Sequence, residues 1–313
     1  MAGLDAFHEM GWKHLGKRIS FYTPGFAPNV LDPVEGSSVT FPPISVTGRS
    51  CALGCKHCAG KLLRSMIPAV TPSQLIRVCE RLAREGCMGC LITGGCGPDG
   101  SVPLKGFVEA IAYVKGQLGL RMAVHTGLVD RDTVMRLRAA GVDSALLDIV
   151  GSDETIREVC HLNATVKDYE LSLRNLREAG IHLVPHLVVG LHYGQLRGEM
   201  KALDIIAANE PSAVIIIVFT PLKGTPMGGF PPPAPGEVAY VLNEARLKLP
   251  RTPLALGCMR PQGLHRVETD ILAVKAGVNA IAFPSREAVA LSRSMGLETS
   301  FSPLCCSQVY ERT

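Results

Sequence analysis

The stretch that decides the fold is VTFPPISVTGRSCALGCKHC, residues 39–58, in which an apolar run is followed at once by three cysteines. The run Val39–Thr47 is rich in β-branched residues and predicts a strand. From here on the same order repeats: an apolar run that ends in Gly, Thr or Pro, and then a longer amphipathic stretch. Alternating strands and helices of this kind are typical of a parallel sheet.

Eight strand-helix units are predicted. The strands are Val39–Thr47, Cys90–Thr93, Met122–Thr126, Ala145–Val150, His182–Val189, Ala213–Thr220, Leu254–Gly257 and Ala280–Phe283. The helices begin near Pro72, Leu104, Arg131, Lys167, Arg197, Gly236, His265 and Ser285. Eight units favour an α/β fold of the TIM type, a (βα)8 barrel, and an open doubly wound sheet is the alternative.

The helix ends and the chain ends complete this plan. Thr71 before Pro72 predicts a helix start, with Thr as the N-cap and Pro at the first helical position. Glycines 86, 141 and 180 follow three helices, as C-terminal glycines do. We expect residues 1–38 to be an N-terminal extension, 39–296 the barrel, and 297–313 a tail that closes the barrel mouth.

Composition and charge narrow the class of protein. The chain has 313 residues, 47% of them hydrophobic, and a net charge of +4 that is spread along its length. No block of basic residues and only one Trp are present, so nucleic acid is not an expected partner. The longest apolar stretch, Ala213–Phe219, is much shorter than the roughly 20 residues that span a bilayer. The N-terminus does not resemble a secretory signal, and we expect a cytoplasmic protein with no membrane partner.

Eleven cysteines are too many to leave unexplained. Disulfides are rare in the cytoplasm, so clustered cysteines indicate metal ligands or redox groups. Cys51, Cys55 and Cys58 have the spacing C-x3-C-x2-C directly after the first strand, and loops in this position open on the face where barrel active sites lie. A structural zinc site needs four ligands, yet the next cysteine is Cys79. Three cysteines suit a four-iron cluster that keeps one iron open for a substrate or cofactor.

This motif, in this loop, resembles that of the radical SAM enzymes. The resemblance implies that Cys51, Cys55 and Cys58 hold a [4Fe-4S] cluster whose fourth iron binds S-adenosylmethionine (SAM). An electron from the cluster then cleaves SAM to methionine and a 5′-deoxyadenosyl radical. His57 stands where the family usually has an aromatic residue, which implies a place beside the adenine; the alternative is an ordinary exposed loop residue.

Other strand ends supply candidate SAM contacts. In LITGG, residues 91–95, Gly94 and Gly95 resemble the family's glycine-rich turn, where the backbone approaches the methionine part of SAM. The family often has an acid next, whereas this chain has Cys96, which is free for another role. Asp148 and Gly190, which end the fourth and fifth predicted strands, are weaker candidates.

Residues 40 to 307 fit the biotin synthase-like branch of these enzymes. FTPLKGTPM, residues 219–227, and LALGCMRPQGLHR, residues 254–266, resemble its sixth-strand loop and its seventh strand. Biotin synthase draws the ligands of a second, sulfur-donating cluster from inside its barrel. At the matching strand ends this chain offers Cys96, His125, His186 and Cys258, with Arg260 close by, so that ligand set is not intact.

The tail pair Cys305-Cys306 suggests a different ligand set. A tail folded over the barrel would bring these thiols to Cys258 or Cys96 as ligands of an auxiliary cluster. This layout resembles the subunits of the two-protein lipoyl synthases. The resemblance implies catalytic roles for Cys258, Arg260, Cys305 and Cys306, and sulfur insertion at an unactivated carbon of an octanoyl chain. It also implies an octanoylated lipoyl-carrier protein, a companion radical SAM subunit, and a ferredoxin or flavodoxin reductant as partners.

Three alternatives stay open. The tail cysteines can simply be part of a docked hydrophobic tail. The chain can be a radical SAM enzyme without sulfur insertion, such as a mutase or a cofactor maturase, which needs only the first cluster. It can also be a non-catalytic iron-sulfur carrier, and reductive cleavage of SAM to 5′-deoxyadenosine separates that class from the enzymes.

Overall fold

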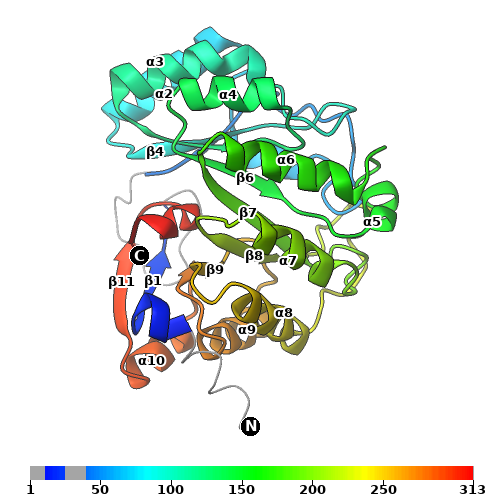
Figure 1. Cartoon of the computed structure of the whole chain (residues 1–313), viewed down its shortest axis with the longest axis vertical. Coiled ribbons are helices and arrows are strands. Elements are labelled where there is room, and N and C mark those ends of the chain that lie inside the picture. Colours follow the sequence, from blue (N-terminus) through cyan, green and yellow to red (C-terminus); the bar gives the residue numbers. More distant parts are fainter. Residues whose placement is uncertain (1–10, 25–39, 313) are drawn as a thin grey trace.

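The computed structural model describes residues 11–24 and 40–312. Residues 1–10, 25–39 and 313, which include most of the expected N-terminal extension and the first residue of the first predicted strand, lie outside the description. One sheet of eleven parallel strands curls through the described part of the chain, in the order β11-β1-β10-β9-β8-β7-β6-β5-β4-β2-β3 (Figure 1). The strands are β1 Arg18–Tyr22, β2 Pro43–Ser45, β3 Ile67–Pro68, β4 Gly89–Thr93, β5 Arg121–His125, β6 Ser144–Asp148, β7 His182–Val189, β8 Val214–Val218, β9 Leu254–Leu256, β10 Ala280–Ala282 and β11 Glu298–Ser302.

The α-helices lie outside this curl (Figure 1). They are α2 Pro72–Arg84, α3 Val108–Leu118, α4 Arg131–Ala139, α5 Asp153–Glu158, α6 Val166–Glu178, α7 Glu199–Ala208, α8 Pro235–Lys248, α9 Leu264–Lys275 and α10 Arg286–Ser294. Three 3-10 helices are shorter: η1 Lys61–Ser65, η2 Leu104–Phe107 and η3 Cys306–Arg312, the last of which belongs to the tail. The predicted helix start is confirmed, because the Thr71 side chain accepts a hydrogen bond from the Gln74 backbone and Pro72 is the first helical residue. Among the described residues, no helix has both the length and the apolar character that crossing a membrane requires.

All eight predicted strands are present, as β2 and β4 to β10, but the predicted number of strands is wrong. Three more strands join the sheet: β1 from the expected extension, the two-residue β3, and β11 from the expected tail. The sequence pattern missed β3 because it is only two residues long, and it missed β1 and β11 because they lie in segments that were assigned to an extension and a tail. As a result β10 pairs with β1 rather than with β2, and the ladder does not close on itself.

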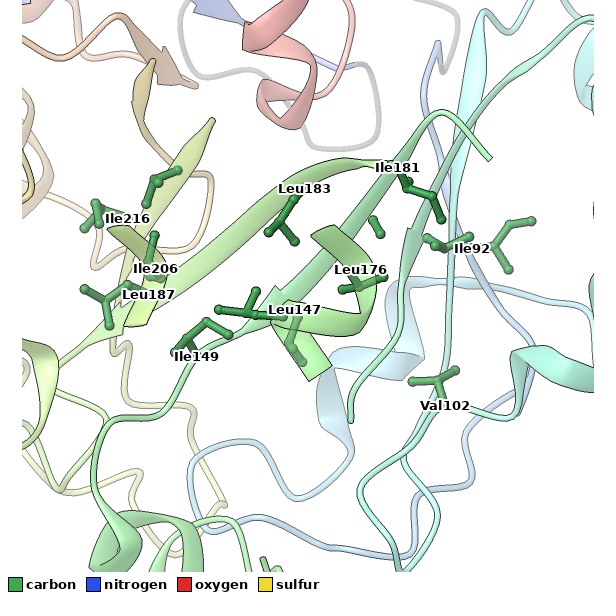
Figure 2. Close-up of a cluster of buried hydrophobic side chains, with 14 of the residues drawn as sticks. Ile92, Val102, Leu147, Ile149, Leu176, Ile181, Leu183, Leu187, Ile206 and Ile216 are labelled. Atoms are coloured by element: carbon green, nitrogen blue, oxygen red, sulfur yellow. The ribbon is translucent and has the colours of Figure 1, made fainter. Parts of the chain in front are cut away.

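The strands bury both faces, so the molecule has two apolar cores. The outer core lies between the sheet and its helices, and Figure 2 shows part of it, with Leu147, Leu187 and Ile216 from strands against Leu176 of α6 and Ile206 of α7. Neighbouring strand residues point the other way because side chains alternate along a strand. These inward residues form the inner core: Ala123, Leu146, Val184, Ile215, Ala255, Ala280 and Ala282.

The C-terminal tail fills the inner core. Leu304, Cys306 and Val309 are buried among the inward strand residues, and Figure 1 shows the red end of the chain inside the curl of the sheet. The Thr40 hydroxyl, just before β2, donates a hydrogen bond to the Pro303 carbonyl, which follows β11. The tail therefore joins the two sides of the sheet that the strand ladder leaves apart.

The far end of the tail lies at the amino-terminal ends of three strands. Glu311 pairs with Arg121 at 3.0 Å, the Gln308 amide donates to Ser144 Oγ at 3.3 Å, and the Tyr310 ring stacks on His182 with centroids 4.4 Å apart. Arg121, Ser144 and His182 are the first residues of β5, β6 and β7. The tail was expected to close the mouth at the carboxyl ends of the strands, and its last turn lies at the opposite end instead.

The substitution Val309→Asp tests the role of the tail as core. It places a carboxylate where the native side chain is 2% exposed, with no cation provided for it. We expect the free energy of unfolding to fall by about 3 to 5 kcal/mol, the usual cost of an uncompensated buried charge. Urea unfolding of the metal-free protein measures it. The control Leu264→Asp, at a site that is 87% exposed, should change stability by less than about 0.5 kcal/mol. Equal effects in the two variants would contradict a packed tail.

Candidate active site

The three motif cysteines lie together in an irregular loop after β2. Their thiols are free and half-buried. The backbone amides of Cys58 and Ala59 both bond to the Cys55 carbonyl, at 3.2 and 2.8 Å, so one tight turn carries Cys55 and Cys58. Hydrogen bonding with Cys55 and then burial raise the pKa of the Cys58 thiol to about 12. Iron binds thiolates, so loading a metal into this loop must release protons.

The segment Val159–His161, just after α5, braces this loop from outside. The Lys56 amide bonds to the Val159 carbonyl at 2.8 Å, the His161 Nδ1 atom lies 3.2 Å from the Leu53 carbonyl, and the Cys55 thiol donates to the Cys160 carbonyl at 3.3 Å. Cys160 itself is buried. Its position beside the motif was missed, because α5 is short and no local pattern links it to a loop a hundred residues earlier.

The Gly-Gly turn after β4 packs directly against the cysteine loop. A Cβ on Gly95 would lie 2.1 Å from the Ser50 carbonyl and 2.6 Å from the Cys51 Cβ, so no larger residue fits there. The Gly95 amide also donates to the Thr47 hydroxyl at 2.7 Å. The contact of Gly95 with the loop explains this glycine without SAM. A Cβ on Gly94 would meet Thr47 at 3.1 Å, a tight but less severe contact.

Cys96 lies beside the motif cysteines rather than with the tail. Its carbonyl accepts the Ala52 amide at 2.8 Å. Burial, followed by the nearby groups Cys51, Asp148 and Cys58, raises the pKa of the Cys96 thiol to about 12. Cys96 therefore lies against the motif loop through its backbone. Its expected role as a ligand of an auxiliary cluster stays a prediction.

A polar group lies at the carboxyl ends of β5, β6 and β7. His125 Nε2 and Asp148 Oδ1 are 3.3 Å apart, and the His125 and His186 rings have centroids 5.9 Å apart. Burial opposes charge on both groups of the pair. Mutual attraction and hydrogen bonding outweigh it, so the pKa of Asp148 is lowered and that of His125 is raised. Burial lowers the pKa of His186 to about 4, which leaves this ring neutral at pH 7.

Two further SAM candidates have different surroundings. The Nδ1 atom of His57 is buried without a hydrogen-bond partner, so it is available to a ligand. Gly190 is enclosed by protein: its amide donates to Glu199 at 2.9 Å, and a Cβ would lie 2.7 Å from the Pro233 ring. Close packing with φ near 76° requires glycine at position 190, and this packing role explains the residue without SAM.

A second group of thiols lies at the end of β9. Cys258 as a residue is solvent-accessible. Partial loss of water around its thiol, and then the charge of the nearby Cys305, raise the pKa of Cys258 to about 11. Hydrogen bonding with Cys305 and burial raise the pKa of the Cys306 thiol, and the charge of Cys258 in turn helps to raise it. Hydrogen bonding with Cys306, and then with Ser307, lowers the pKa of Cys305 to about 7, although burial opposes this. The three thiols are thus near enough to influence one another's pKa, and hydrogen bonding favours the thiolate of Cys305.

Arg260, expected among the catalytic residues, is tied up by the protein. Its Nε and Nη2 atoms bond to the two Asp270 oxygens at 2.7 and 3.1 Å, and its Nη1 and Nη2 atoms donate to the carbonyls of Gly257 and Phe283. Both charged side chains are fully buried. This ion pair joins the ends of β9 and β10 to α9, so Arg260 is a structural residue and the catalytic assignment is corrected.

Comparisons with known proteins agree with this geometry. Residues 45–197 match the model of the Radical SAM superfamily. The chain is 28% identical over 253 residues to a biotin synthase of Paramagnetospirillum magneticum, covering 76% of this chain and 73% of that protein. It is 25% identical over 224 residues to 7,8-didemethyl-8-hydroxy-5-deazariboflavin synthase of Archaeoglobus fulgidus, covering 65% and 66%.

Two solved structures share the fold. Methylornithine synthase superposes with a TM-score of 0.64 at 18% identity, covering 96% of this chain and 90% of that one. A maturase of the [FeFe]-hydrogenase gives a TM-score of 0.66 at 14% identity, covering 98% and 69%. At such identities the likeness is one of fold alone.

The substitution Asp148→Asn tests the polar group. Without the carboxylate only burial acts on His125, so its pKa should fall from above its ordinary 6.5 to below it. In the native chain, protonated His125 stabilises the fold below the unfolded pKa, and this stabilisation is lost as pH rises through the folded pKa. An NMR titration of the metal-free protein, with His125→Gln to assign the resonance, measures the shift. An unchanged pKa would mean that the pair does not form in solution.

The substitution Asp270→Asn tests the buried ion pair. It leaves the Arg260 guanidinium buried without its counter-charge, and we expect a loss of about 3 to 5 kcal/mol in the free energy of unfolding. Asp132→Asn is the matched control, since Asp132 is half-exposed and pairs with Arg136 and Lys105 on the surface. Its cost should stay below about 1 kcal/mol. If urea unfolding shows equal losses, Arg260 is not held as described.

Proposed function

Because the chain belongs to the radical SAM superfamily, in the branch that contains biotin synthase, we propose that this radical SAM enzyme inserts sulfur into an unactivated C–H bond of a protein-bound octanoyl chain. The observation that supports the proposal is a second group of cysteines apart from the motif loop: Cys258 follows β9, and the tail cysteines Cys305 and Cys306 are near enough for the three thiols to influence one another's pKa. A second set of soft sulfur ligands suits a second iron-sulfur cluster.

The residues of the motif loop fit the first cluster and its cofactor. Cys51, Cys55 and Cys58 would hold a [4Fe-4S] cluster through three half-buried thiols. His57 would meet SAM through its buried, unpaired Nδ1 atom. When bound, the cluster and SAM supply one-electron cleavage and a radical that removes a hydrogen atom, and an auxiliary cluster supplies the sulfur atom.

The other residues of the site would hold the auxiliary cluster and fix the strand end that carries it. Cys258, Cys305 and Cys306 would hold the auxiliary cluster, and the low pKa of Cys305 favours the thiolate that iron needs. Arg260 holds the end of β9, which carries Cys258, in place through Asp270.

The proposal brings its own partners. The substrate is the octanoylated lipoyl-carrier protein, and a ferredoxin or flavodoxin supplies the electron. A companion radical SAM subunit adds the second sulfur atom. The enzyme works in the cytoplasm, where these reductants and carriers are present.

A second candidate is a radical SAM enzyme without sulfur insertion. The observation that favours it is the group of His125, Asp148 and His186, which is partly accessible and suits a polar substrate better than an alkyl chain. In this case Cys258, Cys305 and Cys306 only pack.

The decisive experiment is a count of clusters. We expect the anaerobically reconstituted Cys51/Cys55/Cys58→Ala triple variant to keep a second [4Fe-4S] cluster, because the ligands proposed for that cluster, Cys258 and the tail cysteines, are unchanged in it. Iron and sulfide analysis with Mössbauer spectra measures it. Adding Cys305→Ser to this variant should remove the remaining cluster, while Cys87→Ser, far from both sets, should not.

Two outcomes decide between the candidates. A triple variant without iron would contradict sulfur insertion and leave the single-cluster enzyme. Wild-type protein with reductant and SAM should release 5′-deoxyadenosine, and with an octanoylated carrier it should yield a thiolated product. Failure to cleave SAM would favour a non-catalytic iron-sulfur carrier.

A further inference from the structure

The motif loop has a fourth thiol, which neither the first cluster nor the auxiliary one uses in the proposed function. Cys96 follows the Gly-Gly turn of β4, and two contacts fix it against the loop: its carbonyl accepts the Ala52 amide at 2.8 Å, and Gly95 presses on Cys51 with no room for a Cβ. The next residue, Gly97, is held too, since its amide bonds to the Ser101 carbonyl at 2.8 Å. The backbone of Cys96 is therefore anchored on both sides.

The surroundings of Cys96 link it to the loop and to the strand ends. The turn that carries it packs on Cys51 through Gly95, and its own carbonyl accepts the Ala52 amide. The thiol is half-buried, and burial, followed by the charges of Cys51, Asp148 and Cys58, raises its pKa. Asp148 belongs to the accessible polar group at the strand ends.

One other thiol outside the motif lies near the loop, and its position differs. Cys160 is buried behind Cys55, whose thiol donates to its carbonyl at 3.3 Å. Cys160 thus lies beside Cys55, and the Gly95 turn places Cys96 beside Cys51. Because Cys160 is buried whereas Cys96 is half-buried, Cys96 is the better placed as a fourth ligand.

We propose that Cys96 is the fourth thiolate ligand of the cluster held by Cys51, Cys55 and Cys58 while SAM is absent, and that SAM displaces it. The ligand class of this site is a four-iron cluster with sulfur on every iron. This inference rests on the first cluster of the proposed function but not on sulfur insertion. The exchange is balanced: the iron–thiolate bond breaks, the SAM amine and carboxylate bind the iron, and the proton lost by the SAM ammonium passes to the released thiolate.

Two consequences follow. Without SAM the fourth iron is protected, because a fully ligated cluster loses iron less readily than one with an open site. The same exchange lowers the apparent affinity for SAM, since SAM binds only the fraction of protein in which Cys96 has left the iron. Removing the thiol should therefore weaken the cluster and tighten SAM binding together, a combination that mere loss of packing does not produce.

The test compares anaerobic full-length wild type with Cys96→Ala, Cys96→Ser and Cys160→Ala. Without SAM, each protein receives one equivalent of ferricyanide, and EPR follows the conversion to [3Fe-4S]. SAM binding is titrated on the reduced cluster by EPR. We expect Cys96→Ala to convert several-fold faster and to bind SAM about fivefold tighter or more. Cys96→Ser, with nearly the same volume and a poorer ligand, should lie between, and Cys160→Ala should match wild type.

Each other outcome overturns the proposal. Equal conversion rates and equal SAM affinities in Cys96→Ala and wild type would mean that Cys96 is not a ligand. Faster conversion with weaker SAM binding would indicate a damaged site rather than a displaced ligand, and an effect in Cys160→Ala alone would move the role to that residue. None of these readouts requires sulfur transfer, so absence of thiolated product would contradict the proposed function while leaving this inference standing.

Discussion

The inner face of the curled sheet has to be covered, and the structure depends on how this is done. Parallel strands that alternate apolar side chains present two apolar faces, and the helices cover only the outer one. The C-terminal tail covers the inner one, with Leu304, Cys306 and Val309 among the inward residues of the strands. The same packing brings the tail cysteines Cys305 and Cys306 near Cys258. The position of the second thiol group therefore depends on the packing of the tail.

The motif loop shows the opposite situation. It has no regular structure of its own, so its shape depends on neighbours that arrive from elsewhere in the chain. Residues 159–161 bond to its backbone on one side, and the end of β4 presses on it through Gly95 on the other. The segment after β8 is a third neighbour, since the Met227 amide bonds to the Lys56 carbonyl at 3.2 Å. Three cysteines spaced for a cluster are therefore held by long-range contacts, and a thiol on one of these neighbouring segments lies close to the site.

The charged groups near the strand ends divide by burial. Arg260 and Asp270 are fully buried, and such charges persist only when each is paired and hydrogen-bonded, which leaves them no capacity for chemistry. His125 and Asp148 also form a pair, but their side chains are partly accessible. The Arg260–Asp270 pair therefore stabilises the fold, whereas the His125–Asp148 pair stays partly open to solvent. Solvent accessibility, which the sequence does not contain, separates the two pairs.

The sequence alone determined the eight strand-helix units, the helix caps and glycine stops, and the motif loop after the first of those strands, because side-chain alternation, caps and ligand spacing are local. The tertiary structure decided what depends on contacts across the whole chain. It added β1, β3 and β11 to the sheet, placed the tail inside it, paired Arg260 with Asp270, and set Cys96 against the motif loop beside Cys51. Residue spacing does not encode these contacts, since they arise from the curvature of the sheet and from which of its faces remain to be covered.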